Sequence, residues 1–169
     1  VSMMEPYTRS RVVDLLAKQK KPTPATREAI LSLAGDTAEW VRTRAFAALE
    51  KVKIQEPEAI RLEGLLTRKA ADLRQNLLTV LLKQPDPQVV RSADRLLAAK
   101  SAPQRLGGLE LLHQMHKTKR AAAECRERAL TYHEKRGKLS EEEQQLLAAF
   151  LDSERETPAL DNALGLLNP

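Results

Sequence analysis

The sequence predicts an all-α protein built from stacked antiparallel helix pairs. Leu and Ala, which favour helices, dominate the apolar residues, whereas aromatic residues make up only 3% of the chain. Apolar residues recur at helical spacing in many segments. Similar segments also return at a regular interval, because their arginines Arg42, Arg74 and Arg105 lie 32 and then 31 residues apart.

The individual helices follow from prolines and apolar spacing. We expect an N-terminal helix over Thr8–Lys18. A proline in the first turn leaves no N–H group unpaired, so Pro24, Pro57 and Pro87 should each open the first helix of a pair. The predicted pairs are Pro24–Ala34 with Ala38–Val52, Pro57–Thr67 with Ala70–Lys83, Pro87–Ala99 with Ala102–Met115, and a longer pair Lys119–Arg136 with Glu141–Leu151, followed by a short helix Pro158–Leu167.

Polar residues at the ends of these helices support the boundaries. Side-chain oxygens before a first turn, acidic residues three positions later, and a glycine after a last turn are typical of helix ends. The expected capping residues are the N-caps Thr23 and Asp86, the capping-box pairs Asp36–Glu39 and Ser140–Glu143, and Gly137 as the end of the long helix.

The pairs align with one another in a single register. Ile30 and Leu33 of the first pair correspond to residues 62 and 65 of the second and to residues 93 and 96 of the third. One pair alone cannot bury its apolar face, so neighbouring pairs must stack.

The second helix of the first pair reads Val-Arg-x-x-Ala-x-x-Ala-Leu over Val41–Leu49, and this segment resembles a HEAT repeat. The later units keep the arginine but replace Ala45 with Leu77 and Gly108. The resemblance implies a right-handed α-solenoid, with clear repeats over residues 24–115 and a divergent repeat or cap over 117–169. We expect one domain, residues 1–169, cut from a larger protein. Residues 42–82 are also similar to the helical-repeat region of large bacterial proteins similar to the molybdate metabolism regulator.

The charge is distributed unevenly. Residues 1–139 hold 27 Lys and Arg against 16 Asp and Glu, and residues 140–169 hold 1 against 7, which together give the net charge of +5. The basic body could attract an anionic partner or hold the acidic end of the chain. A single cysteine, no apolar run long enough to span a membrane and no signal-peptide pattern in residues 1–7 predict a cytoplasmic protein without a membrane partner.

The arginines of the repeats are the candidate contact residues. Stacking would align the second helices, whose polar side chains would then face a partner. The partner-binding candidates are Arg42, Arg44, Arg74, Asn76 and Arg105. The alternative is that the aligned arginines form ion pairs with acidic residues of the adjacent unit, and we favour this structural interpretation.

We therefore predict a non-catalytic scaffold that binds a protein partner or an adjacent domain of the same polypeptide. The alternative is a nucleic-acid-binding protein that uses its basic turns, although these lack the interleaved aromatics that single-strand binding uses. Some bacterial DNA glycosylases resemble HEAT solenoids and use Trp, Asp and Arg on a basic face. Trp40, Asp36 and Arg42 or Arg44 are the one local trio of that kind, but we expect Trp40 to be packed at a helix start.

Other reactive residues favour simple structural roles. His113 and His116 share one helix face and could bind a metal ion with Cys125 or His133, but no known ligand spacing supports this, so surface histidines are the simpler interpretation. Cys125 more simply packs as a small apolar residue. We predict no catalytic residues, cofactor, metal or small-molecule ligand.

Overall fold

The computed structural model describes residues 5–19, 22–68 and 70–152, and all the regular structure in these ranges is helical. The predicted all-α class is therefore confirmed for this part of the chain. The α-helices, with one short 3-10 helix (η1), are α1 (Pro6–Ala17), α2 (Pro24–Ala34), α3 (Glu39–Leu49), α4 (Glu56–Gly64), η1 (Leu65–Thr67), α5 (Ala71–Leu82), α6 (Asp86–Leu97), α7 (Ala102–Lys117), α8 (Ala122–Lys135) and α9 (Glu141–Asp152). The predicted helix Pro158–Leu167 lies outside the described residues.

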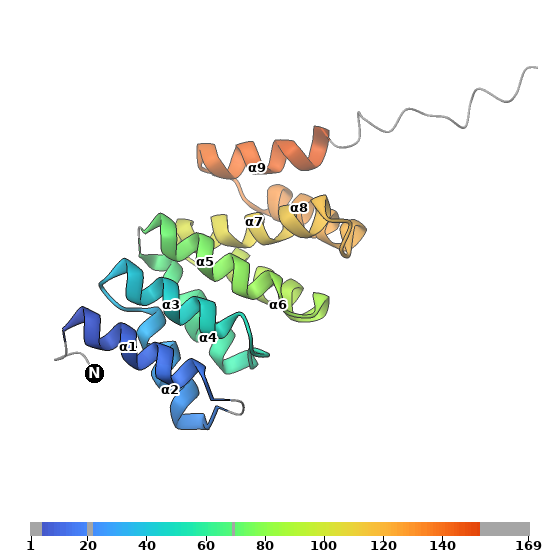
Figure 1. Cartoon of the computed structure of the whole chain (residues 1–169). Helices are drawn as coiled ribbons and strands as arrows, with labels where there is room; N and C mark the ends of the chain where they lie inside the picture. The colour runs from blue at the N-terminus through green and yellow to red at the C-terminus, as the bar shows by residue number, and fades with distance from the viewer. Residues whose placement is uncertain (1–4, 20–21, 69, 153–169) are drawn as a thin grey trace, which may run out of the picture.

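The helices form two rows (Figure 1). In one row α1, α3, α5, α7 and α9 contact one another in chain order, and in the other α2, α4, α6 and α8 do the same. The rows also contact each other within each pair, most extensively between α6 and α7.

Aliphatic side chains fill the space between the rows. Leu62, Leu73, Leu77 and Leu109 are completely buried, each contributing roughly 1.5–3 kcal/mol relative to an exposed position. Phe46 is likewise buried. The aligned residues of the first helices are buried as the repeat register predicts, except residue 65, which is half-buried.

Prolines and two of the predicted caps lie where expected. Pro24 is the first residue of α2, and the N–H of Thr26 donates to the Thr23 hydroxyl at 3.2 Å. At the start of α9, the Ser140 N–H donates to Glu143 at 2.7 Å while the Glu143 N–H donates to the Ser140 hydroxyl at 3.2 Å, which completes the capping box.

Two other predicted caps are wrong, and in both cases an arginine binds the carboxylate. Asp86 is the first residue of α6 rather than its N-cap, and it accepts hydrogen bonds from Arg120. Ala38 is the N-cap of α3, and Asp36 accepts hydrogen bonds both from Arg9 and from the Ala38 N–H.

The long predicted helix Lys119–Arg136 begins later than expected. Lys119 and Ala121 adopt left-handed φ angles of 58° and 43°, which helices do not contain, so α8 begins at Ala122. Its last residue is Lys135, and Gly137 follows without a positive φ.

Candidate interaction surface

Arg42 links α3 to α5 inside the molecule. Its side chain is 7% exposed, and its Nη2 lies 2.6 Å from the Asp72 carboxylate in the first turn of α5. Its Nη1 donates to the carbonyl oxygens of Asp36 and Thr37, at 3.0 and 2.8 Å. These bonds occupy the guanidinium, so Arg42 offers no free charge to a partner.

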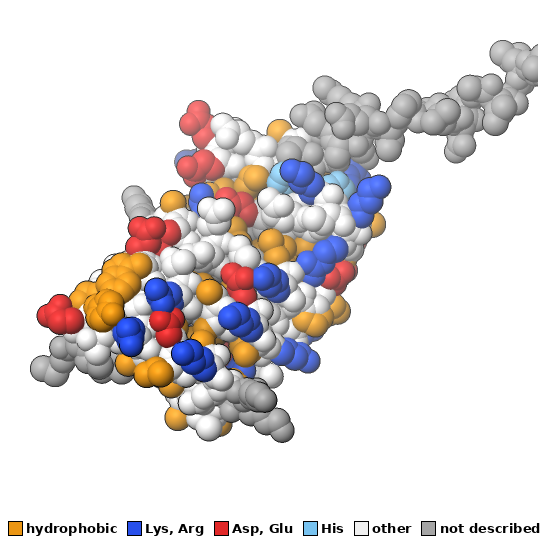
Figure 2. Space-filling view, in the orientation of Figure 1, with side chains coloured by type: hydrophobic (Ala, Val, Ile, Leu, Met, Phe, Trp, Pro, Cys, Tyr) orange, Lys and Arg blue, Asp and Glu red, His pale blue; other side chains and the backbone are white. Residues whose placement is uncertain are grey.

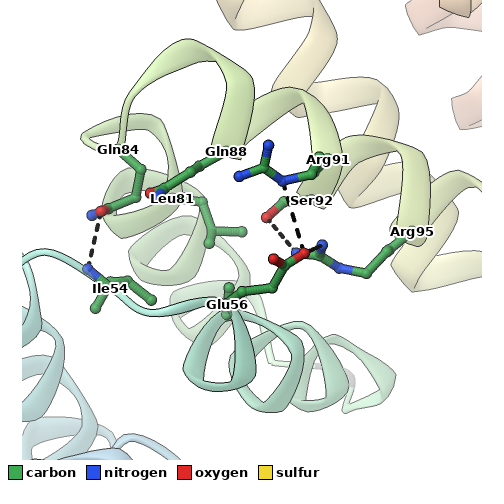
Figure 3. Close-up of a pocket in the computed structure, with 9 residues that line it drawn as sticks. Ile54, Glu56, Leu81, Gln84, Gln88, Arg91, Ser92 and Arg95 are labelled. Atoms are coloured by element: carbon green, nitrogen blue, oxygen red, sulfur yellow. Dashed lines mark hydrogen bonds and ion pairs between the residues drawn. The ribbon is translucent and has the colours of Figure 1, made fainter.

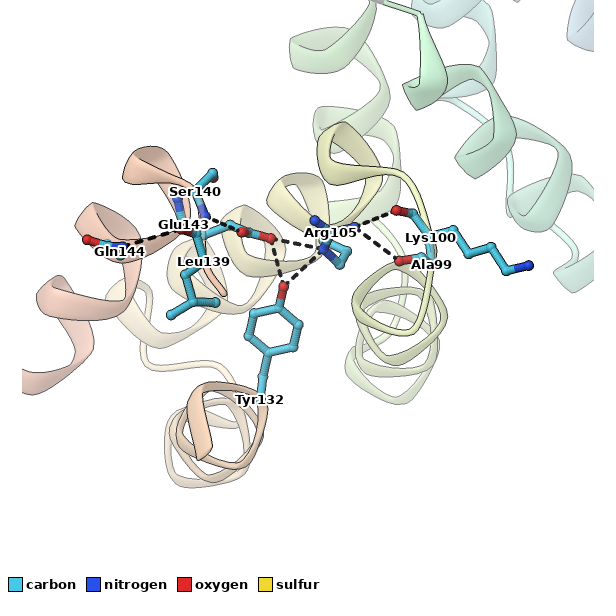
Figure 4. A network of polar contacts seen from close by, with 8 residues as sticks. All are labelled: Ala99, Lys100, Arg105, Tyr132, Leu139, Ser140, Glu143 and Gln144. Carbon is cyan, nitrogen blue, oxygen red and sulfur yellow. Dashed lines mark hydrogen bonds and ion pairs between the residues drawn. The ribbon is translucent and has the colours of Figure 1, made fainter. Parts of the chain in front are cut away.

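Arg105 takes the corresponding place between α7 and α9 (Figure 4). Its Nε donates to Glu143 at 3.0 Å and to the Tyr132 hydroxyl at 3.2 Å, and Tyr132 in turn donates to Glu143 at 2.7 Å. Its Nη1 donates to the carbonyl of Lys100 at 2.6 Å. Burial alone would raise the pKa of Glu143, but hydrogen bonds from Ser140, Tyr132 and Arg105 lower it overall.

A third arginine, Arg9, completes this pattern of inter-helix bonds. Its Nε and Nη2 donate to the two oxygens of Asp36, at 2.7 and 2.8 Å, just before α3 begins. Arg9, Arg42 and Arg105 thus each bind a carboxylate at the start of the next helix in the row. We did not predict the role of Arg9 from the sequence, although the acidic residue at each following helix start was a visible signal.

Arg74 is the exception among the aligned arginines. Its side chain is 38% exposed, and its Nε lies 3.6 Å from Glu110. In the repeat alignment Pro103 of α7 stands where Asp72 stands in α5, so no carboxylate is present at that helix start. Asn76, another predicted contact residue, is half-buried on the same helix.

The row of first helices is joined by a second set of ion pairs. Arg27 Nε lies 2.7 Å from Glu58, and Arg95 Nε lies 2.9 Å from Glu63. Further pairs across this row are Arg61 with Glu28 and Arg128 with Asp94. Much of the basic charge is therefore engaged between helices, as the structural interpretation of the arginines predicts.

Exposed apolar side chains gather on α1 and α3, where orange atoms lie among blue side chains in Figure 2. Tyr7, Leu15 and Trp40 are 64%, 65% and 44% exposed. With the basic residues Arg11, Lys18 and Arg44 they line a hollow of about 280 Å³, and these six residues are called the α1–α3 patch.

Helical spacing explains this gathering. Tyr7, Arg11 and Leu15 follow one another at intervals of four residues on α1, and Trp40 and Arg44 are four apart on α3. The Arg11 Nη1 donates to the Tyr7 hydroxyl at 3.1 Å, and Arg44 forms an ion pair with Asp14. The patch therefore combines Trp, Tyr and Arg side chains, the residue types that dominate binding energy at protein interfaces, with an exposed leucine.

The exposure of Trp40 corrects our prediction that it is packed. Val41, Ala45 and Phe46 occupy the buried face of α3, which turns Trp40 outward. Two members of the glycosylase-like trio are already engaged in ion pairs. Arg9 binds Asp36, and Asp72 binds Arg42, so neither side chain is free to contact a ligand.

A narrow cleft between α4 and α6 is held by polar bonds (Figure 3). The buried Gln84 accepts from the Ile54 N–H at 3.0 Å and donates to the Val80 carbonyl at 3.2 Å. Arg95 lies across the opening, 2.9 Å from Glu56. The free volume is about 20 Å³, room for about one water molecule, so the cleft serves packing rather than ligand binding.

His113 and His116 are partly buried and Cys125 is fully buried, whereas His133 is exposed. His113 and His116 are half-buried against Phe150, with ring centroids 5.6 and 5.4 Å away, which corrects their predicted surface position. Burial raises the pKa of the Cys125 thiol to about 11. Within the described residues, no three His, Cys, Asp or Glu side chains are grouped so that they could hold a metal ion.

A row of lysines marks the carboxyl ends of α1, α3, α5 and α7. Lys18, Lys51, Lys83 and Lys117 occupy these ends, at intervals of 33, 32 and 34 residues. Lys83 pairs with Glu50, whereas Lys18, Lys51 and Lys117 form no ion pair within the described ranges. A positive charge at a helix carboxyl end is favoured by the helix dipole whatever the function.

None of the helices in the described ranges is long and apolar enough to cross a membrane. Across residues 1–169 the chain matches a family of unknown function, DUF5724. No curated protein and no solved structure matches it.

Proposed function

The chain belongs to the DUF5724 family, and we propose that it is a non-catalytic helical-repeat domain that binds a protein partner or a neighbouring domain. In this proposal the helix pairs form a right-handed, HEAT-like α-solenoid. Two rows of helices that contact one another in chain order support that architecture. The repeat-to-repeat ion pairs support it as well, since they join residues about one unit apart.

The α1–α3 patch is the observation on which the binding proposal rests. The buried arginines Arg42 and Arg105 are bonded internally, whereas Tyr7, Leu15 and Trp40 remain open to solvent. Exposed apolar groups ringed by polar residues are typical of protein interaction sites. Among the predicted contact residues, Arg44 alone belongs to this patch, and we assign it as a rim residue.

Site-specific photo-cross-linking in the native cells tests this proposal. A photoreactive amino acid at Leu15 should yield discrete protein adducts, and the same group at Ile60 of α4 is the control because Ile60 is 50% exposed outside the patch. Trp40→Glu should remove the adducts formed at Leu15 without unfolding the protein, because Trp40 is not part of the core. Equal adduct patterns at both positions would contradict the proposal.

A second candidate function, nucleic-acid binding, is favoured by the row of lysines. Figure 2 shows Lys and Arg side chains, with acidic ones among them, across the face in view. Phosphate contacts of this kind weaken steeply with salt. We expect no binding of a fluorescent duplex or single strand at physiological salt. Binding that persists at physiological salt, and that the triple variant Lys18→Glu/Lys51→Glu/Lys117→Glu abolishes, would favour this alternative.

A further inference from the structure

The α1–α3 patch has a shape that suits a rounded protein element. Its hollow of about 280 Å³ adjoins a second hollow of about 340 Å³, and the walls of both include Trp40 and Arg44. Residues of α3 alone line the second hollow, so these two side chains form the boundary between the hollows. Adjoining hollows with a ridge between them fit the ridged surface of a helix.

The apolar groups of the patch are also spaced to match a helix. Tyr7 and Leu15 are eight residues apart on α1, which corresponds to about 12 Å along the helix axis. On a helix that lies along α1, two residues seven or eight positions apart cover the same distance. A docked helix should therefore carry apolar residues at positions i, i+4 and i+7 or i+8, which is the pattern of an amphipathic helix.

The charge of the patch favours an acidic partner. Arg11 and Lys18, both on α1, form no ion pair within the described ranges. Arg44 is paired with Asp14, and the acidic Glu39 lines the second hollow on the α3 side. A helix over α1 therefore meets two unpaired positive charges seven residues apart, about 11 Å, which carboxylates along one flank of a helix can reach.

The same charges disfavour a second copy of this chain as the occupant. A symmetric contact between two α1–α3 patches would bring Arg11 and Lys18 of both molecules into one interface. Like charges that face each other across an interface weaken binding. The occupant should therefore be a different segment of opposite charge.

We propose that the α1–α3 patch binds an amphipathic helix of about three turns, with apolar residues over Tyr7, Leu15 and Trp40 and acidic residues facing Arg11 and Lys18. Three turns match the 12 residues of α1, which span about 18 Å. This inference rests on the proposed function and names the chemistry of the partner.

Fluorescence of Trp40 tests the proposal directly, because Trp40 is the single tryptophan of the chain. Three synthetic peptides without tryptophan are titrated into the full chain. The first is an amphipathic helix with a leucine stripe and Glu along its flanks. The second carries Lys in place of every Glu, and the third is the acidic peptide with two central prolines that break the helix.

The acidic helix should shift Trp40 emission to shorter wavelength and bind at least about tenfold more tightly than either other peptide. Arg11→Glu/Lys18→Glu should reverse the preference in favour of the Lys peptide, with unchanged circular dichroism. The control variant Lys117→Glu/Lys135→Glu, which changes exposed charges on α7 and α8, should keep the original preference.

Equal binding of the acidic and basic helices, tighter binding of the basic one, or no shift of Trp40 emission with any peptide would overturn the inference. A shift with phosphatidylserine vesicles but not with the acidic helix would also overturn it and would assign the patch to a membrane surface. Cross-linking at Leu15 judges the proposed function separately. Protein adducts there, without binding of the acidic helix, would retain the interaction site and reject this class of partner.

Discussion

Two glycines in α7 pack so closely against neighbouring helices that an added Cβ atom would be crowded at either position. A Cβ atom on Gly107 would lie 2.9 Å from Leu66 Cδ1, and one on Gly108 would lie 3.1 Å from the Ala93 carbonyl oxygen, Leu96 Cβ and Leu97 Cγ. These glycines therefore allow α7 to approach α6 and η1. Gly64 has no atom within 4 Å of such a position.

We expect Gly108→Ala to destabilise the fold by about 1–2 kcal/mol, since overpacking by a methyl group in a core outweighs the better helix propensity of alanine. The matched variant Gly64→Ala should instead be neutral or stabilising by up to about 1 kcal/mol. Urea unfolding followed by circular dichroism measures both. A stabilised Gly108→Ala protein would show that α6 and α7 can separate without cost.

At this scale the sequence was informative about apolar spacing but not about which polar atoms meet. The alignment placed Arg42, Arg74 and Arg105 at equivalent positions, yet it could not show that Pro103 leaves Arg74 without a partner like those of the other two. Trp40 was misjudged for a different reason. Val41, Ala45 and Phe46 take the buried face of α3, which leaves Trp40 outside it.

Individual helices are joined to their neighbours in the row by arginine–carboxylate bonds. Arg42 and Arg44 lie two residues apart on α3 but in opposite environments, with side chains 7% and 51% exposed. Buried pairs leave an uncompensated charge when one partner is removed, whereas exposed pairs are screened by water.

We expect Arg42→Ala to lower the free energy of unfolding by about 2–4 kcal/mol, because it leaves Asp72 and two backbone carbonyls without their hydrogen-bond donor. Arg44→Ala, which breaks the exposed pair with Asp14, should cost less than about 1 kcal/mol. Chemical denaturation of both variants gives the comparison. Equal losses would mean that the Arg42 bonds add nothing beyond a surface contact.

The bond of α9 to α7 and α8 should depend on pH through Glu143. Its pKa is lowered in the folded state, so its contribution to stability is complete above the unfolded value of about 4.3 and is lost as pH falls through the folded pKa. Glu143→Gln should reduce stability at pH 7 and flatten its decline below about pH 4.5, as measured by urea unfolding across pH 3–7.

Glu110 provides the control of opposite sign. Burial raises its pKa, with Glu142 acting in the same direction and Arg74 against it, so stability is lost as pH rises through the folded value. Glu110→Gln should therefore hold or increase stability at pH 7. The opposite directions of the pKa shifts of Glu143 and Glu110 would be contradicted if both variants shifted the free energy of unfolding in the same direction at pH 7.

Among the elements, starts marked by proline or a complete capping box could be read from the sequence. The start of α8 could not, because Lys119 and Ala121 adopt left-handed backbone angles for which the sequence offers no glycine. The false caps at Asp36 and Asp86 have a common feature. A distant arginine, Arg9 or Arg120, binds each carboxylate, and Asp36 accepts the Ala38 N–H as well.

At the scale of the whole molecule, the main helix contacts in the described ranges join near neighbours in chain order, and no such contact joins α1 to α9. The inner helices α5 and α7 are flanked on both sides of their row, whereas α1 is flanked on one. Stability in such arrays is approximately a sum of contributions from adjacent units.

Amide hydrogen exchange should accordingly be slowest in α5 and α7 and fastest in α1, because opening an end layer disrupts fewer contacts. Mass-spectrometric exchange on the intact protein measures the gradient, with exchange from the unfolded chain as the reference for intrinsic rates. Uniform protection across all helices would indicate a single cooperative unit instead.

The arginine bonds also have a mechanical consequence. Arg9 meets Asp36, Arg42 meets Asp72, and Arg105 meets Glu143, so the longest of these three bonds spans 38 residues. None of them ties the two ends of the described chain together. A molecule pulled from both ends would therefore lengthen in steps, one layer at a time, and would recoil by re-forming the same short-range bonds, which is how an extensible spring behaves.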